Sequence, residues 1–274
     1  MATVQNGNRE KKLSDLGTAV GLAAAGMLLG FVTLLFLGSV LRASGLLSVL
    51  PQSFSIVLSL LALQGIGLVG TAIFYLSTTD KEFSYVKLRK PSLKQVAAGF
   101  GGVLIMLAAV VVISMILQSL GQSTAQHGTV EQIEQNPRIA LYMVPLSILV
   151  IGPCEELLFR GVIQTKLRES FSGAGAVGVA SGIFALIHIP AYGSDVIVDI
   201  IQQGGVTMEN LQSLGVTLSI LFVLALVLGY VYERTENLTV PMITHGFYNA
   251  FLFGMVYIGT QYADELEEAA YLLF

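Results

Sequence analysis

Long apolar stretches, separated by short polar segments, run through most of this chain. A membrane-spanning helix needs about 20 mainly apolar residues. Stretches of this kind predict seven helical spans, of which the fifth is short: 16–41, 54–76, 95–120, 138–170, 175–189, 214–232 and 240–257. The connection 191–213 is mildly amphipathic, and the pattern leaves open whether it gates a cavity or simply links two helices.

The composition agrees with this pattern. Hydrophobic residues make up 54% of the chain and charged residues 12%, about half the charged share of roughly 25% that a soluble domain carries. The single cysteine, Cys154, excludes an internal disulfide and a metal site built on several thiolates, and we expect it to serve packing. The predicted fold class is an all-α polytopic membrane helix bundle with membrane lipid as a partner and no nucleic acid.

Basic residues predict the orientation of the bundle, because cytoplasmic loops are enriched in Lys and Arg. With the N-terminus inside, the inner segments are 1–15, 77–94, 161–175 and 233–239. They hold 11 of the 14 basic residues: Arg9, Lys11, Lys12, Lys81, Lys87, Arg89, Lys90, Lys94, Lys166, Arg168 and Arg234. We therefore predict a multi-pass membrane protein whose N-terminus is cytoplasmic.

We divide the chain into four regions. A cytoplasmic tail covers 1–15, the first three membrane helices with their loops cover 16–137, a helical core covers 138–258 and an acidic C-terminal tail covers 259–274. The many Gly and Ala residues of the first three spans favour close helix packing. Pro91 and Ser92 are typical of a helix start and precede the third span.

Two adjacent carboxylates, Glu155 and Glu156, lie in the apolar fourth span. An ionised side chain costs about 2.5–3.5 kcal/mol at the centre of a membrane on insertion scales, so a retained pair indicates a function. Arg160 follows Glu156 at i,i+4, the favourable spacing for a supporting ion pair, which leaves Glu155 as the functional candidate. Pro145 and Pro153 are expected to bend this helix and free backbone carbonyls nearby.

Three further polar residues come to a similar depth on other helices. At a rise of about 1.5 Å per residue, Glu155 and His188 each lie roughly 20 Å along their helices, and His245 and Asn249 lie roughly 10–20 Å along theirs. This agreement predicts one site inside the bundle. The alternatives are a neutral His188 bonded to backbone, and interhelical hydrogen bonds made by His245 and Asn249.

These residue types permit hydrolysis by water. A carboxylate and an imidazole can activate a water, while a second imidazole and a carboxamide can donate hydrogen bonds to an oxyanion. No serine or cysteine is placed as a nucleophile beside a histidine. Two histidines and a glutamate also match a catalytic zinc set, so Glu155, His188 and His245 are the ligands if a divalent metal such as Zn is bound. The spacing favours neither reading.

Three short motifs occur in order on successive predicted helices: EExxxR (Glu155, Glu156, Arg160), FxxxH (Phe184, His188) and HxxxN (His245, Asn249). This arrangement over roughly 138–258 resembles the CPBP intramembrane proteases, the CAAX proteases and bacteriocin-processing enzymes, which include the Ras-converting type II CAAX prenyl endopeptidases. The resemblance implies that Glu155 and His188 activate the water and that His245 and Asn249 hold the oxyanion. Glu156, Arg160 and Phe184 would have supporting roles.

The resemblance also implies a function. Family members that process farnesylated proteins remove the last three residues after a prenylated cysteine, at a cavity open to the cytoplasm. We therefore expect an intramembrane endopeptidase that cuts near the C-terminus of a peptide or prenylated CAAX protein, with no cofactor required on the best reading. The alternatives are a non-catalytic scaffold or immunity protein, and a proton-coupled transporter, against which the lack of an inverted repeat counts.

Overall fold

A computed structural model of the protein describes residues 2–125, 132–133 and 136–262. His127 and the acidic residues 264–268 lie outside the described residues. The described part of the chain consists of helices and their connections, without a strand, which confirms the all-α fold class.

Within that part, six segments are long and apolar enough to cross a membrane: Gly7–Ala43, Ser53–Thr78, Leu93–Ser119, Arg138–Leu167, Gly173–Tyr192 and Met208–Thr235. They correspond to the first six predicted spans and support an integral multi-pass membrane protein. The seventh predicted span is the helix α13 (Thr239–Gln261) of 23 residues, which is long enough at about 1.5 Å per residue to cross the hydrocarbon layer. It is less apolar because it carries His245 and Asn249.

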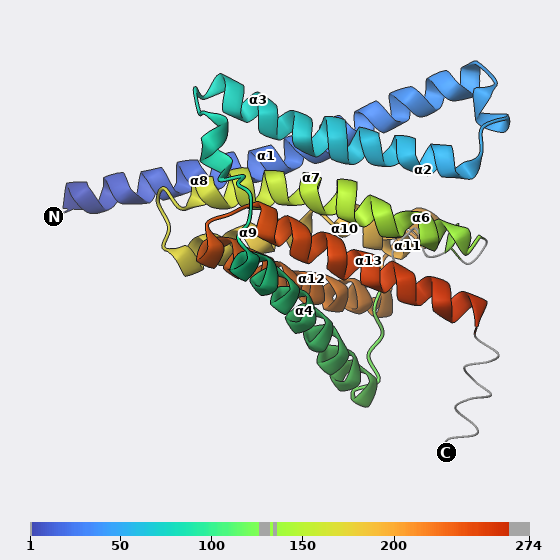
Figure 1. The fold of residues 1–274 in the computed structure, drawn as a ribbon. Helices are drawn as coiled ribbons and strands as arrows, with labels where there is room; N and C mark the ends of the chain where they lie inside the picture. The colour runs from blue at the N-terminus through green and yellow to red at the C-terminus, as the bar shows by residue number, and fades with distance from the viewer. Residues whose placement is uncertain (1, 126–131, 134–135, 263–274) are drawn as a thin grey trace.

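The N-terminal part is a helical hairpin. The long helix α1 (Ala2–Ala43) packs against a second, continuous helix. This helix consists of α2 (Gln52–Leu60), the π-helical segment η2 (Leu61–Val69) and α3 (Gly70–Thr78). Figure 1 shows this pair crossing at the top of the molecule. A Cβ added to Gly67 would lie 2.6 Å from the carbonyl oxygen of Gly26, so the absence of a side chain is what permits the crossing. The predicted close packing is confirmed here.

The fourth span is continuous but alternates between α- and π-helical turns. Its segments are α6 (Arg138–Leu146), η4 (Ser147–Ile151), α7 (Gly152–Glu156), η5 (Leu157–Gln164) and α8 (Thr165–Leu167). Pro145 and Pro153 lie just before η4 and at the start of α7. Since proline has no N–H for the regular ladder, hydrogen bonding shifts to the wider π pattern near these positions. Such turns often occur at functional sites.

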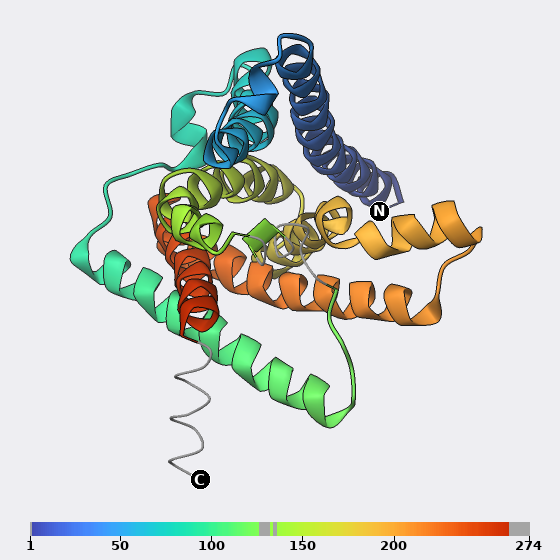
Figure 2. The same ribbon diagram turned by 90° about the vertical axis from the view of Figure 1, so that its right-hand side faces the viewer.

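The remaining spans are α4 (Leu93–Ser119), α9 (Gly173–Leu186) and α12 (Met208–Thr235). The predicted start of α4 is confirmed, because Ser92 and Gln95 exchange the two hydrogen bonds of a capping box. In Figure 2, α4 lies on the outside of the bundle beside α12 and α13, and contacts join it to both helices. After α9 the chain turns at His188, followed by the short α10 (Ile189–Tyr192).

The connection whose path the pattern left open is largely helical. It contains α11 (Ser194–Gln203), whose Ile197 and Ile201 are exposed. Helix α12 begins at Met208, six residues before the predicted position 214. The reason is local: Thr207 caps α12 by accepting a hydrogen bond from the Asn210 amide, while Asp199 accepts bonds from the Thr207 backbone, the Thr207 hydroxyl and the Asn210 side chain. This network ties α11 to the start of α12.

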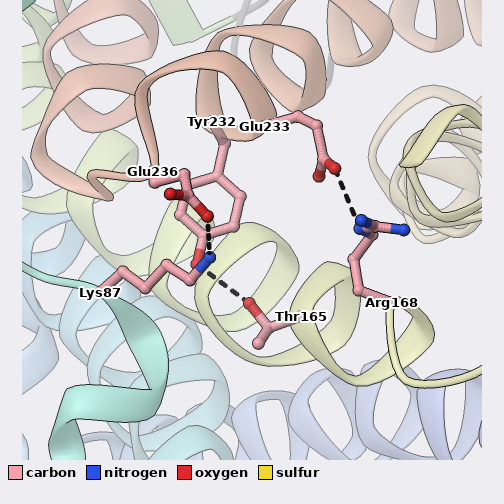
Figure 3. A pocket seen from close by; sticks show the side chains of 6 residues that line it. All are labelled: Lys87, Thr165, Arg168, Tyr232, Glu233 and Glu236. Atoms are coloured by element: carbon pink, nitrogen blue, oxygen red, sulfur yellow. Dashed lines mark hydrogen bonds and ion pairs between the residues drawn. The ribbon is translucent and has the colours of Figure 1, made fainter. Parts of the chain in front are cut away.

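The four segments predicted to share the inner side meet at one end of the bundle. Ion pairs connect them: Lys166 with Asp15, Lys81 with Glu169, Lys87 with Glu236, and Arg168 with Glu233. The last two pairs line a pocket of about 170 Å³ together with Thr165 and Tyr232, whose hydroxyls are 2.9 Å apart (Figure 3). None of the predicted site residues lines this pocket.

The stability of this end is expected to depend on pH through Glu169. Partial burial acts to raise the pKa of Glu169, but hydrogen bonds from Lys166, Lys81 and Tyr85 outweigh it and lower this pKa from 4.5 to about 2. A carboxyl with a depressed folded-state pKa contributes stability that is present above pH 4.5 and is lost as the pH falls toward 2. The thermal midpoint in detergent should therefore fall less steeply below pH 5 for Glu169→Gln than for the wild type. Parallel curves would contradict this.

Candidate active site

The carboxylate of Glu155 lies at the contact between the N-terminal hairpin and the fourth span. Glu155 is buried, with 7% of the residue exposed. One oxygen, Oε1, accepts a hydrogen bond of 2.8 Å from Nε2 of Gln64 on η2. The other, Oε2, lies 3.9 Å from Nε2 of His245 on α13. The predicted meeting of Glu155 and His245 inside the bundle is thus what the structure shows.

Glu156 is fully buried and connects two cationic or potentially cationic groups. Its Oε1 accepts hydrogen bonds from Nη1 of Arg160 at 2.9 Å and from Nδ1 of His245 at 2.8 Å. The i,i+4 pair with Arg160 is as predicted, and the bond to His245 is an interhelical hydrogen bond of the kind that the alternative for His245 describes. Because Arg160 keeps its proton and Glu156 is its counter-ion, the hydrogen of the second bond belongs to Nδ1 of His245. Nε2 of His245 is therefore directed toward Glu155.

Arg160 links the fourth span to two other helices. Its guanidinium is 1% exposed, donates through Nη2 to the carbonyl of Ala225 on α12 at 3.1 Å, and lies 4.7 Å from the ring centroid of Phe184 on α9. A cation over an aromatic face is attracted by the ring quadrupole. Arg160 thus holds Glu156 in place and, through it, His245.

Phe184 and His188 form the α9 side of the site. The Phe184 ring centroid lies 4.6 Å from that of His188 and 6.0 Å from that of His245. Nδ1 of His188 lies 2.7 Å from the carbonyl oxygen of Phe184; it therefore donates, and Nε2 is left as an acceptor in the neutral ring. The bond at Nδ1 agrees with the alternative in which His188 is hydrogen-bonded to backbone, but among the described residues Nε2 has no such bond. No direct hydrogen bond within this part of the chain connects His188 with Glu155.

Asn249 lies one turn beyond His245 on α13 and is partly buried. It stands outside the hydrogen-bonded cluster that the described residues form around Glu156. The structure therefore brings Glu155, Glu156, Arg160 and His245 into one cluster with Phe184 and His188 packed against it, and places Asn249 next to it on the helix of His245.

A close helix crossing positions this cluster. Gly152 on α7 and Gly246 on α13 meet backbone to backbone: a Cβ on Gly152 would lie 2.8 Å from the Gly246 nitrogen, and a Cβ on Gly246 would lie 2.9 Å from the Ile148 Cα. These glycines are sequence neighbours of the acidic pair and of His245. Their lack of side chains lets His245 come within hydrogen-bond distance of Glu156.

Gly246→Ala is accordingly expected to destabilise the protein by about 1–3 kcal/mol, because an added methyl group is forced into a packed backbone contact. The measurement is the unfolding free energy in mild detergent. Gly254→Ala is the matched control on the same helix, since a Cβ there meets nothing within 4 Å; it should stabilise slightly, as alanine favours helix over glycine. Equal effects of the two substitutions would contradict the crossing.

Gln64 is the site neighbour that sequence reasoning missed. It is the only carboxamide in the apolar stretch 54–76, and this isolation was the available signal. Nothing along the sequence indicates its partner, because 91 positions separate it from Glu155.

The metal alternative remains a prediction. Across residues 2–125, 132–133 and 136–262, no group of three or more His, Cys, Asp and Glu side chains is arranged to hold a metal ion. Of the predicted ligands, Glu155 and His245 are close together, while Nδ1 of His188 is occupied by the Phe184 carbonyl. Cys154 is partly buried and free.

Comparison with known proteins identifies a family for part of the chain. Residues 137–251 match the family model described as type II CAAX prenyl endopeptidase Rce1-like. This segment is an Rce1-like domain. It contains all seven predicted site residues, whereas Gln64 lies outside it. No curated protein and no solved structure matches the chain. The suspected family is thus confirmed for this segment, and at the family level the Rce1-like domain supports an intramembrane endopeptidase.

Proposed function

We propose that this protein is an intramembrane endopeptidase that hydrolyses a peptide bond near the C-terminus of a membrane-anchored protein, with a prenylated CAAX protein as the first substrate to test. The observation that carries the proposal is the 3.9 Å approach of Glu155 Oε2 to His245 Nε2 inside the Rce1-like domain. This approach brings a general base next to a hydrogen-bond donor for an oxyanion.

Glu155 is assigned as the base. A water bound to Oε2 transfers a proton to the carboxylate while its oxygen attacks the scissile carbonyl carbon. His188 assists, since its Nε2 is free to accept the second hydrogen of the same water when Nδ1 donates to the Phe184 carbonyl. The proton taken up by Glu155 then passes to the amine that leaves. A water attacks directly, which agrees with the sequence, where no serine or cysteine stands beside a histidine.

His245 and Asn249 are assigned to the oxyanion. With Nδ1–H donated to Glu156, His245 donates through Nε2 in its imidazolium form. In that form the cluster of Glu155, Glu156, Arg160 and His245 has zero net charge, which favours its burial in a membrane. Asn249, one turn along α13, supplies the second donor to the developing charge.

The membrane orientation is part of the proposal. The end of the bundle where the four basic segments meet is assigned to the cytoplasm, because Lys and Arg are enriched on that side. The active site then opens to the cytoplasm, where prenylated C-termini are found.

The test is cleavage of a quenched fluorescent peptide by the purified wild-type protein. Two peptides of the same sequence, with and without a prenyl group on the CAAX cysteine, are compared, and the products are identified by mass spectrometry. We expect release of the last three residues from the prenylated peptide. Equal cleavage of both peptides would contradict prenyl recognition but not the peptidase. A folded protein that cuts neither this pair nor a set of unprenylated membrane peptides would favour the scaffold.

A chelator arm with zinc add-back addresses the metal alternative in the same assay. Turnover that survives the chelator would support the glutamate-dependent mechanism. Turnover that is lost with the chelator and restored by zinc would support Glu155, His188 and His245 as ligands.

A further inference from the structure

We propose that Gln64, which lies outside the Rce1-like domain, is a positioning residue for Glu155, so that the N-terminal hairpin is part of the active site. This inference rests on the proposed peptidase function. Its starting point is the hydrogen bond of 2.8 Å that Nε2 of Gln64 donates to Oε1 of Glu155. Among the described residues, Gln64 is the one hydrogen-bond donor to this carboxylate.

The bond determines which carboxylate oxygen can react. Oε1 is occupied by Gln64, whereas Oε2 is the oxygen that faces His245. Arg160, the buried cation nearby, donates to Glu156 and not to Glu155. Without Gln64, the Glu155 carboxylate would be free to rotate about its last side-chain bond. A base misplaced by about 1 Å can cost on the order of 100-fold in rate.

The segment that carries Gln64 is held firmly. Gly67 of η2 contacts Gly26 and Gly30 of α1 at backbone distance, and Leu68 of η2 is buried in the same apolar cluster as Leu158 of η5. The segment η2 is therefore packed against α1 on one side and against the fourth span on the other. Gln64 lies within a π-helical stretch of the kind that often accompanies functional sites.

Gln64 does not serve packing well. Its Oε1 is buried and has no hydrogen-bond partner within the described part of the chain, and a buried acceptor left unpaired is destabilising. The side chain cannot be turned round to relieve this, because the amide oxygen would then face the carboxylate oxygen. A methionine of the same length would fill the space without a buried unpaired oxygen. The presence of a glutamine at position 64 is thus explained by its side-chain N–H group, which donates a hydrogen bond to Glu155.

Gln64→Met tests the inference, with Gln164→Met as the matched control. Gln164 is fully buried, whereas Gln64 is partly buried, but both donate their side-chain amide to one partner and both have a buried Oε1 without a hydrogen-bond partner among the described residues. The partner of Gln164 is the backbone carbonyl of Gly229 rather than a site carboxylate. We expect Gln64→Met to lower kcat for the peptide by about 10–100-fold, with KM within about twofold of the wild-type value and the thermal midpoint within about 3 °C. Gln164→Met should keep kcat within about twofold.

A kcat of Gln64→Met near the wild-type value would overturn the inference, as would an equal loss in Gln164→Met. The contact is also tested without turnover, by a thermal-unfolding cycle of Gln64→Met, Glu155→Met and the double variant, since a methionine at position 155 has no carboxylate to accept the bond from Gln64. Non-additive shifts of the thermal midpoint would support the contact, and additive shifts would overturn the inference. Absence of turnover in the wild type would contradict the peptidase function alone, so the two failures are distinguishable.

Discussion

Glu155→Gln is expected to lower the turnover of the cleaved peptide by about 10²–10⁴-fold, the range that general acid–base catalysis contributes. A carboxamide cannot take up the proton of the attacking water. The amide oxygen can still accept the bond from Gln64, so the variant keeps the shape and the local contact of the native side chain. The fold should persist, and the loss should appear in kcat.

The matched control for this substitution is Glu169→Gln, which makes the same chemical change at the ion-paired end of the bundle. Its turnover at neutral pH should remain within about twofold of the wild type. Turnover retained in a clean Glu155→Gln preparation would show that another group activates the water. A matching loss in both variants would indicate damage to the fold instead of removal of the base.

Arg160→Met is expected to cause the largest loss of stability, about 3–5 kcal/mol of unfolding free energy. Breaking a buried ion pair leaves an uncompensated charge in the interior. Here the charge left behind is Glu156, which is 0% exposed and whose Oε2 already lacks a hydrogen-bond partner among the residues that the structure describes. The substitution also removes the bond to Ala225 and the contact with the Phe184 ring.

The measurement for Arg160→Met is chemical unfolding in mild detergent, beside Arg168→Met. Arg168 pairs with Glu233 at a more exposed position, with side chains 43% and 28% exposed, and exposed pairs contribute about 0–1 kcal/mol. The double variant Glu156→Gln/Arg160→Met should recover part of the loss, since both charges are then removed. Similar losses in Arg160→Met and Arg168→Met would contradict the buried network.

The two variants separate the roles of the neighbouring glutamates. Glu155 is assigned to chemistry, and its conservative replacement should affect turnover more than stability. Glu156 and Arg160 are assigned to support, and disrupting their pair should affect stability first and activity through the displaced His245. The bond between Glu156 and Nδ1 of His245 is the physical link between these effects.

The sequence alone determined the features that depend on local geometry. Apolar stretches of membrane length predicted the spans, because a helix buried in lipid must satisfy its own backbone. The i,i+4 spacing predicted the pair of Glu156 and Arg160, and the Ser92 start predicted the beginning of α4. The three motifs on successive helices predicted a shared site and the family of the matched segment. The four region boundaries stay predictions.

Only the tertiary structure decided which distant groups touch. The contact between Gln64 and Glu155 spans 91 positions and that between Glu156 and His245 spans 89. Such contacts depend on which helix faces pack together and at what distance, and here the backbone crossing of Gly152 and Gly246 sets both. Helical periodicity places a side chain on one face of its own helix but does not indicate which other helix packs against that face. That is why the sequence predicted the candidate site residues, while their partners and the orientation of His245 came from the fold.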